Sequence, residues 1–318
     1  MKLNTLLIGL GNIGMIYDKS QDNNDFIQTH AKAINLHPNF NLIGGIDISD
    51  KNRRIFEKRY RKTTSKNILN FSYKEQIDLV IIATPTETHL AIVENTLKFL
   101  KPKMILCEKP LSYNYEDAKN IINLCNFYNT KLFVNYIRRS NPGVLEIKKN
   151  IDTRIFMPPF RGTCWYSKGL YNNGSHFINL LEFWLGEFVK IEVFNKGRLI
   201  NEFDNEPEFL IQFSNGDVVF RAAWEEFSSF YEIQLLCKSG ILKYSKGGDQ
   251  ICFYESDKIK KFEDLKRRKL NSNLKIYQYD VLEDIKKEYQ GLNTTICKGQ
   301  EALSTQRIIY LLNKQLQN

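Results

Sequence analysis

The sequence has no apolar run of about 18 residues, the length that a membrane-spanning helix needs, so we expect no membrane partner. Its six cysteines show no Cys-x-x-Cys spacing and its four histidines are not paired. This pattern argues against a disulfide framework or a zinc site, and we expect no metal. The chain begins directly with a strand pattern in place of a signal peptide, which favours a cytoplasmic protein.

Acidic residues are fewer than basic ones, and the 318-residue chain has a net charge of +9. The excess is concentrated at 258–275, but no nucleic-acid-binding motif surrounds that stretch. We therefore expect a solvated basic surface and no nucleic-acid partner, and an anionic small molecule explains the charge equally well. The length suits about two domains, and 42% hydrophobic with 25% charged residues predicts a globular protein.

Continuous apolar runs recur through the first 135 residues, with helix-like stretches between them. Such runs are typical of strands buried on both faces of a parallel sheet. Apolar residues at helical spacing predict helices at 87–100 and 115–128, so the units are βαβ. The predicted fold of 1–135 is a Rossmann-type doubly wound parallel α/β sheet. The expected strands are 6–8, 42–46, 79–83, 104–107 and 132–134.

From residue 136 to 318, strands separated by turn signals replace this pattern. Asn215-Gly216 is a strong hairpin signal, so we expect an α+β domain with a largely antiparallel open sheet. Because few helices remain to cover it, its apolar face predicts a homo-oligomer, a dimer or a tetramer. The expected strands are 154–156, 189–194, 209–213, 218–223, 231–237, 241–244 and 251–254, and the expected helices are 176–185, 277–289 and 299–315.

A glycine-rich loop follows the first expected strand and fits the pattern G-x-G-x-x-G, which lets a pyrophosphate approach a helix N-terminus. Asp47 ends the second strand, where an acidic residue binds the adenosine ribose of a dinucleotide. A carboxylate there repels a 2′-phosphate, so NAD is favoured over NADP, although Arg53 and Arg54 leave NADP open. The cofactor-binding residues predicted here are Gly9, Gly11, Asn12, Ile13, Gly14 and Asp47.

Glu108-Lys109-Pro110 follows the strand expected at 104–107. Ligands of open α/β sheets bind outside the carboxyl ends of the strands, so Lys109 is expected beside the same crevice as the glycine loop. Burial and neighbouring positive charge would lower the pKa of such an amine toward the range useful for proton transfer. The alternative is an ordinary exposed lysine.

These motifs resemble the Gfo/Idh/MocA oxidoreductases, the family of glucose-fructose oxidoreductase and inositol dehydrogenase, over nearly the whole chain. The resemblance implies that Lys109 lies near the nicotinamide and that His176, at the start of a helix, serves as the acid/base. Thr84, Pro85, His89 and Glu108 are then expected around the cofactor, with His30 supporting the loops. The matching segments are Gly9–Gly14, Ala83–Pro85 with His89, Glu108–Pro110, Asn135–Arg139 and Gly174–Asn179.

Two features depart from the family pattern. Many members have an aspartate four residues before the histidine and another three residues after it, whereas this chain has Asn172 and Asn179. A neutral amide supplies only a hydrogen bond and does not stabilise a protonated imidazole as a carboxylate does. The polar stretch 19–25 is an insertion, expected either as a loop near the cofactor or as surface decoration.

The resemblance implies an NAD(H)-dependent enzyme of carbohydrate metabolism that transfers hydride to or from a carbinol carbon of a sugar or cyclitol. Arg138 and Lys168 fit a phosphorylated or nucleotide-linked sugar, or alternatively form surface salt bridges. Two other interpretations stay open: a non-catalytic dinucleotide-binding sensor or scaffold, and an imine or double-bond reductase. The candidate substrate-binding residues are Tyr136, Arg138, Lys168, Asn172 and Asn179.

Overall fold

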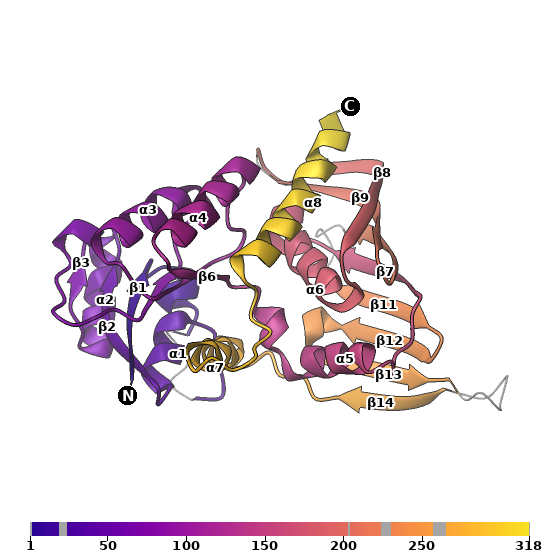
Figure 1. Cartoon of the computed structure of the whole chain (residues 1–318), viewed down its shortest axis with the longest axis horizontal. Coiled ribbons are helices and arrows are strands. Elements are labelled where there is room, and N and C mark those ends of the chain that lie inside the picture. The colour runs from indigo at the N-terminus through magenta and orange to yellow at the C-terminus, as the bar shows by residue number, and fades with distance from the viewer. Residues whose placement is uncertain (1, 19–23, 203, 224–229, 257–264, 318) are drawn as a thin grey trace. The chain divides into compact units, whose positions relative to one another are not determined.

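The computed structural model describes residues 2–18, 24–202, 204–223, 230–256 and 265–317. The chain forms two compact units, and Figure 1 labels their elements. The first unit comprises Met1–Ile137 and Lys275–Leu303, and the second comprises Arg138–Leu274 and Ser304–Asn318. This differs from the expected division into 1–135 and 136–318, because part of the C-terminal region returns to complete the core of the first unit.

The first unit contains a six-stranded parallel sheet in the order β3-β2-β1-β4-β5-β6. This is the strand order of a Rossmann fold, so the predicted class is confirmed. The very short β3 was not predicted, because its two residues are polar and carry no apolar signal. The strands are β1 (Leu3–Ile8), β2 (Phe40–Ile46), β3 (Thr64–Ser65), β4 (Leu79–Ile82), β5 (Met104–Cys107) and β6 (Lys131–Val134).

Helices cover both faces of this sheet. Alternate strand residues point to opposite faces, so Leu7 and Ile81 join one buried cluster while Leu6 and Val80 join the other. The first cluster includes residues of α1, α2 and α7, and the second includes residues of α3 and α4. These helices are α1 (His30–Leu36), α2 (Asp50–Tyr60), α3 (His89–Phe99), α4 (Tyr115–Phe127) and α7 (Tyr277–Tyr289).

The second unit contains an eight-stranded sheet in the order β14-β13-β12-β11-β7-β10-β9-β8. Only the pairing of β7 with β10 is parallel among these strands, so the predicted, largely antiparallel sheet is confirmed. Asn215 lies in the turn between β9 and β10, as its hairpin signal predicted. The strands are β7 (Phe160–Tyr166), β8 (Phe188–Leu199), β9 (Asn205–Phe213), β10 (Gly216–Ala222), β11 (Glu232–Cys237), β12 (Gly240–Ser245), β13 (Gln250–Glu255) and β14 (Lys266–Leu270).

One face of this sheet packs against helices α5 (Pro142–Asp152) and α6 (Ser175–Leu185) and the end of α8 (Gly299–Gln317). The apolar stripe predicted for α6 is buried in this core. The indole Nε1 of Trp184 in α6 donates a hydrogen bond to the Val144 carbonyl of α5 at 3.2 Å. The helix that carries His176 is therefore fixed to the sheet and to a neighbouring helix.

One strand that the sequence predicted for the second unit is wrong. The strand expected at 154–156 is absent, because the chain turns after α5 and Arg154 adopts a positive φ of 60°. Helix α5 and strand β7 occupy this region instead. Of the basic stretch 258–275, residues 258–264 lie outside the described part, and Lys266–Leu270 form the edge strand β14, whose first four residues are exposed.

Candidate functional site

The glycine loop connects β1 to a short helix, η1 (Asn12–Ile16). Gly9 has a φ of 94°, and a Cβ there would collide with the carbonyl of Ala83. A Cβ on Gly14 would likewise collide with the carbonyl of Gly9, whereas one on Gly11 would meet nothing within 4 Å. The first and last glycines therefore permit close backbone packing, while the space beside Gly11 is open for a pyrophosphate, so the loop fits a dinucleotide.

Asp47 follows β2 and is hydrogen-bonded to the glycine loop. Its Oδ2 accepts from the Leu10 amide at 2.7 Å and its Oδ1 accepts from the Ser49 amide at 2.7 Å. Arg53 donates to the carbonyls of Asp47 and Ile48 at 2.8 and 3.1 Å. The carboxylate therefore lies at the expected end of β2, and Arg53 is engaged with backbone carbonyls beside it.

His89 links two loops at the same edge of the sheet. Its ring is fully buried, with Nδ1 3.1 Å from the Leu111 carbonyl and Nε2 3.0 Å from the Thr84 carbonyl. Burial lowers the pKa of His89 although these carbonyls oppose that effect. The His89 side chain thus lies between the Thr84-Pro85 turn after β4 and the loop after Pro110, and it supports both loops from within the core.

Glu108 and Lys109 follow β5, and the Lys109-Pro110 peptide is cis. The Glu108 Oε1 lies 2.7 Å from His30 Nε2 and accepts a hydrogen bond from Asn135 Nδ2 at 2.6 Å. Lys109 is half-buried. The C-terminal residues of β1, β2, β4 and β5 pair directly, so the glycine loop, Asp47, Thr84 and the Glu-Lys-Pro segment all emerge at one edge of the first unit's sheet.

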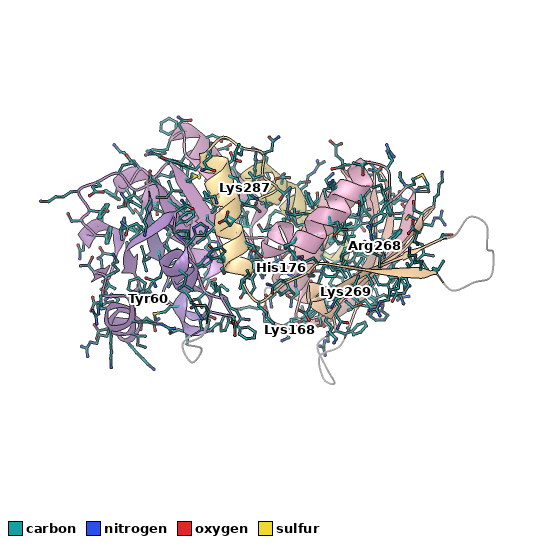
Figure 2. All side chains as sticks on the ribbon, turned by 90° about the horizontal axis from the view of Figure 1, so that it is seen from below. Tyr60, Lys168, His176, Arg268, Lys269 and Lys287 are labelled. Carbon is teal, nitrogen blue, oxygen red and sulfur yellow. The ribbon has the colours of Figure 1, made fainter. Side chains whose placement is uncertain are left out.

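The second unit carries His176 as the second residue of α6, with 7% of its surface exposed. Figure 2 labels it together with Lys168, which precedes the short helix η5 (Leu170–Gly174). Two carboxylates that the sequence did not single out hold this segment. Asp204 accepts from the Tyr171 and Asn172 amides at 2.9 and 3.1 Å, and Glu206 accepts from the Gly169 amide at 3.2 Å.

These two carboxylates are buried just before and within β9, with 7% exposure for Asp204 and none for Glu206. Burial raises the pKa of the Asp204 carboxyl, although hydrogen bonds from backbone amides oppose the shift. Glu206 is also paired with Arg198 at 2.8 Å. No motif marks these residues, because their partners are backbone amides that lie more than thirty positions away.

The predicted substrate-binding residues have different environments. Arg138 stacks over Phe177, 4.8 Å from the ring centroid, and its Nε donates to the Tyr244 hydroxyl at 3.1 Å. Asn172 and Lys168 are exposed, whereas the Asn179 amide is buried and donates to Thr305 of α8 at 3.1 Å. Tyr136 is buried in the core of the first unit. Arg138 thus packs beside the residue that follows His176, while Asn179 joins two helices.

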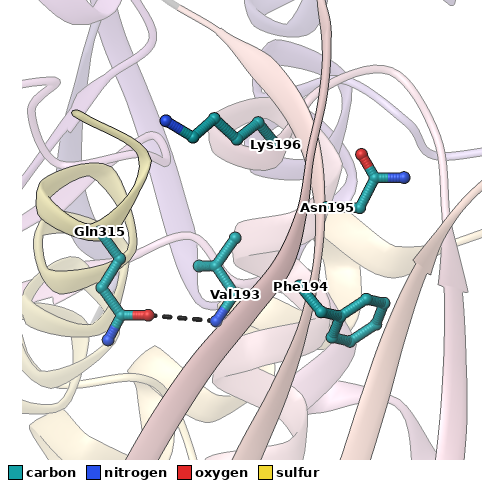
Figure 3. A pocket seen from close by; sticks show the side chains of 5 residues that line it. All are labelled: Val193, Phe194, Asn195, Lys196 and Gln315. Atoms are coloured by element: carbon teal, nitrogen blue, oxygen red, sulfur yellow. Dashed lines mark hydrogen bonds between the residues drawn. The ribbon is translucent and has the colours of Figure 1, made fainter. Parts of the chain in front are cut away.

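Two pockets of about 380 Å³ each lie away from the predicted residues. One lies between β8 and α8, where Gln315 accepts a hydrogen bond from the Val193 amide at 3.1 Å (Figure 3). The other involves α4, β6 and the start of α8. Within the described ranges, no group of three or more His, Cys, Asp or Glu side chains is arranged to hold a metal ion, and no helix is long and apolar enough to span a membrane.

Comparison with known proteins identifies the class of the first unit. Residues 3–136 match the family model "Oxidoreductase family, NAD-binding Rossmann fold". Over these residues the first unit resembles the NAD-binding Rossmann domain of the Gfo/Idh/MocA oxidoreductases.

Curated relatives align with part of the chain. The chain is 27% identical over 146 residues to inositol 2-dehydrogenase of Rhizobium meliloti (strain 1021), covering 46% of this chain and 39% of that protein. It is 35% identical over 75 residues to D-xylose 1-dehydrogenase [NADP(+)] of Haloarcula marismortui, covering 24% of this chain and 20% of that protein. The chain therefore spans about two fifths or less of the length of these relatives.

Solved structures share the fold over both units. A putative NADPH-dependent oxidoreductase from Desulfitobacterium hafniense has a TM-score of 0.82 at 17% identity, covering 99% of this chain and 96% of that one. The WlbA dehydrogenase from Bordetella pertussis, solved with NADH and UDP-GlcNAcA, has a TM-score of 0.77 at 14% identity, with the same coverage. At these identities the likeness establishes the fold alone.

Proposed function

We propose that the protein is an NAD(H)-dependent oxidoreductase that transfers hydride to or from a carbinol carbon of a sugar or cyclitol. The observation that carries this proposal is the convergence of the glycine loop, Asp47 and the Glu-Lys-Pro segment at one edge of an NAD-binding sheet. The dinucleotide supplies the redox chemistry, while the protein supplies orientation and proton transfer. The named relatives are an inositol and a xylose dehydrogenase, which agrees with this substrate class.

We assign proton transfer at the hydroxyl to Lys109, with His176 in a supporting role. Lys109 stands next to a fixed carboxylate, Glu108, in a rigid loop after β5. His176 is held in place by a well-packed helix, but its flanking positions 172 and 179 carry amides. Because an amide does not stabilise a charged imidazole as a carboxylate does, we assign the larger contribution to Lys109.

Within the sugar class, we propose a phosphorylated or nucleotide-linked substrate. Arg138 packs against Phe177, the residue after His176. Lys168 lies close to His176 in the sequence. Guanidinium and ammonium groups are the usual partners of phosphate oxygens. A structural relative solved with UDP-GlcNAcA shows that this fold accommodates such a ligand in another protein.

For the cofactor, we propose a preference for NAD(H) over NADP(H). The Asp47 carboxylate is fixed by the Leu10 and Ser49 amides where the ribose is expected. A fixed anion there repels a 2′-phosphate. Arg53 is turned to the carbonyls of Asp47 and Ile48, and Arg54 pairs with Asp50 at 2.9 Å, so both cations already have partners.

We also propose a homo-oligomer formed through the second unit. On the sheet face away from the helices, Trp165, Phe194 and Leu236 are 38%, 49% and 49% exposed. They alternate with residues of the same strands that are buried against the helices. Exposed apolar side chains on one face of a sheet are a common feature of interfaces between subunits.

The function is tested by incubating the purified protein with NAD⁺ and a panel of inositols, free sugars, sugar phosphates and nucleotide sugars, and following nicotinamide absorbance. The expected result is reduction of NAD⁺ with at least one sugar or cyclitol, and no reduction by the Lys109→Met variant. NAD binding without hydride transfer to any member of the panel, in both reaction directions, would favour the sensor interpretation. Oxidation of NADH by an added imine, with no turnover of the sugar panel, would favour the third interpretation.

A further inference from the structure

Glu108 and its partners form a cluster of polar side chains drawn from separate segments of the first unit. His30 comes from the start of α1, Asn135 from the residue after β6, and Gln278 from α7. The Asn135 Nδ2 that donates to Glu108 also lies 3.2 Å from the Gln278 Oε1. His30, Asn135 and Gln278 are each at most 2% exposed, so this cluster is part of the core.

A carboxylate in such a place needs partners, because burying an unpaired charge costs several kcal/mol, on the order of the net stability of a small domain. Burial alone would raise the pKa of Glu108, but His30, the Asn135 amide and the Lys109 charge together hold it below its ordinary value. Glu108 is therefore an anion at neutral pH, and His30 makes the largest contribution to that state.

The position of His30 is itself fixed by a buried carboxylate at the start of the insertion. Asp18 is fully buried, and its Oδ2 accepts hydrogen bonds from the Gln28 and Thr29 amides at 2.9 and 2.7 Å. The Thr29 side chain in turn caps α1 through the Lys32 amide at 3.4 Å. The first residue of α1 therefore has little freedom to move, and its imidazole is directed at Glu108.

These contacts form a continuous path from the segment after the glycine loop to Glu108, the residue before Lys109. The path runs from Asp18 through the Thr29 amide and the His30 imidazole to the Glu108 carboxylate. The titratable groups that bear on Glu108 are His30 from α1, Lys109 beside it, His89 from α3, Tyr277 from α7 and Cys107 of β5.

We propose that His30 is a positioning residue for Lys109: its imidazole, together with the Asn135 amide, fixes the Glu108 carboxylate as a permanent anion beside the Lys109 amine. Only the expected effect of His30 on turnover rests on the proposed function. Lys109 follows Glu108 directly in the chain, and the charges of the two side chains interact. A neighbouring anion favours the protonated amine. His30 therefore sets the pH at which Lys109 gains or loses its proton, without touching the substrate.

The test measures Lys109 directly and needs no substrate. The full chain is labelled with a trace of a small amine-reactive reagent across a pH series, and peptide mass spectrometry gives the pH midpoint of labelling at Lys109. His30→Ala is expected to move this midpoint to lower pH by about one unit, the low end of the effect of a neighbouring charge. Glu108→Gln is expected to move the midpoint further in the same direction. His30→Gln retains an N–H donor and is expected to keep the midpoint of the unaltered protein.

A matched control is His37→Gln, which removes another buried histidine paired with a glutamate, Glu283, at 3.0 Å in the same unit. It is expected to leave the Lys109 midpoint unchanged. An unchanged midpoint in folded His30→Ala, or an equal shift in the His37 variant, overturns the proposal. If His30→Ala does not fold, a shifted midpoint in His30→Gln, or an unchanged midpoint in Glu108→Gln, overturns the proposal.

With a sugar that the unaltered enzyme turns over, His30→Ala should shift the pH profile of kcat in the same direction as the labelling midpoint, with the KM for the nicotinamide cofactor unchanged. A purely structural role would instead change KM and stability without moving the profile, and that result also overturns the proposal. If no sugar is turned over but the labelling shifts occur, the function assigned above fails while the role of His30 stands.

Discussion

Asp280 offers a test of the electrostatics of the first unit that is independent of any substrate. It lies in the first turn of α7, half-buried, with Asp284 one helical turn further on. Burial, then the charges of Asp284 and Glu283, raise the pKa of Asp280 from 3.8 to about 7, against a smaller opposing effect of Lys287. Lys287 is already paired with Asp284 at 3.0 Å, which limits its influence on Asp280.

The sign of the effect on stability follows from this shift. A carboxyl whose folded-state pKa lies above its unfolded value favours the folded state most at low pH, and that contribution is lost as the pH rises through the folded pKa. The full shift corresponds to about 4 kcal/mol, at about 1.4 kcal/mol per unit. Because Asp280 is only half-buried, water screens much of this, and we expect about 1–2 kcal/mol.

Asp280→Asn should therefore stabilise the protein by about 1–2 kcal/mol at about pH 8 and have little effect at about pH 4. Chemical unfolding followed by circular dichroism at both pH values measures this difference. Asp117→Asn, also in the first turn of a helix but on α4, is the control and should show no comparable gain. Destabilisation by Asp280→Asn at high pH, or an equal gain at both pH values, would refute the reasoning.

Lys109→Met should abolish turnover and leave NAD(H) binding, measured by fluorescence titration, nearly intact. His176→Ala should reduce kcat by a smaller factor. Acid/base groups typically contribute about 10²- to 10⁴-fold to the rate. Asp47→Ser should narrow or reverse the preference for NAD(H), and tighter NADP(H) binding by the unaltered protein would contradict the assignment of Asp47. Trp165→Asp should dissociate the oligomer in light scattering, whereas a monomeric unaltered protein at micromolar concentration would contradict the proposed interface.

Except for β3, the strands of the first unit were predictable because each contains an apolar run that is buried on both faces of the sheet. In the second unit the sheet is covered on one face only, and the signal depends on alternation. In β7 the inward residues include Gly162, and the outward residues include Trp165, so the alternation is weak. Packing with neighbouring strands, which the sequence alone does not show, decides that this segment is a strand.

Helix α5 had a local signal that could have identified it. Asn141 accepts a hydrogen bond from the Gly143 amide as the N-cap, and Pro142 occupies the first position. Asparagine followed by proline is typical of a helix start. In contrast, nothing local marks Asp204 or Glu206, because each is recognisable only from the backbone amides that it accepts. Motifs identified the residues of the proposed chemistry, but not the groups that hold them.

The two residues assigned to proton transfer differ in their electrostatic support. Beside Lys109, the Glu108 carboxylate is available to act on the amine, because its own position is fixed by His30 and Asn135. In the unit that carries His176, the Asp204 carboxylate accepts hydrogen bonds from backbone amides of η5. A carboxylate that fixes a backbone segment orients the residues on it but does not share a proton with them. Removing Lys109 should therefore cost more activity than removing His176, although both are held by buried acids.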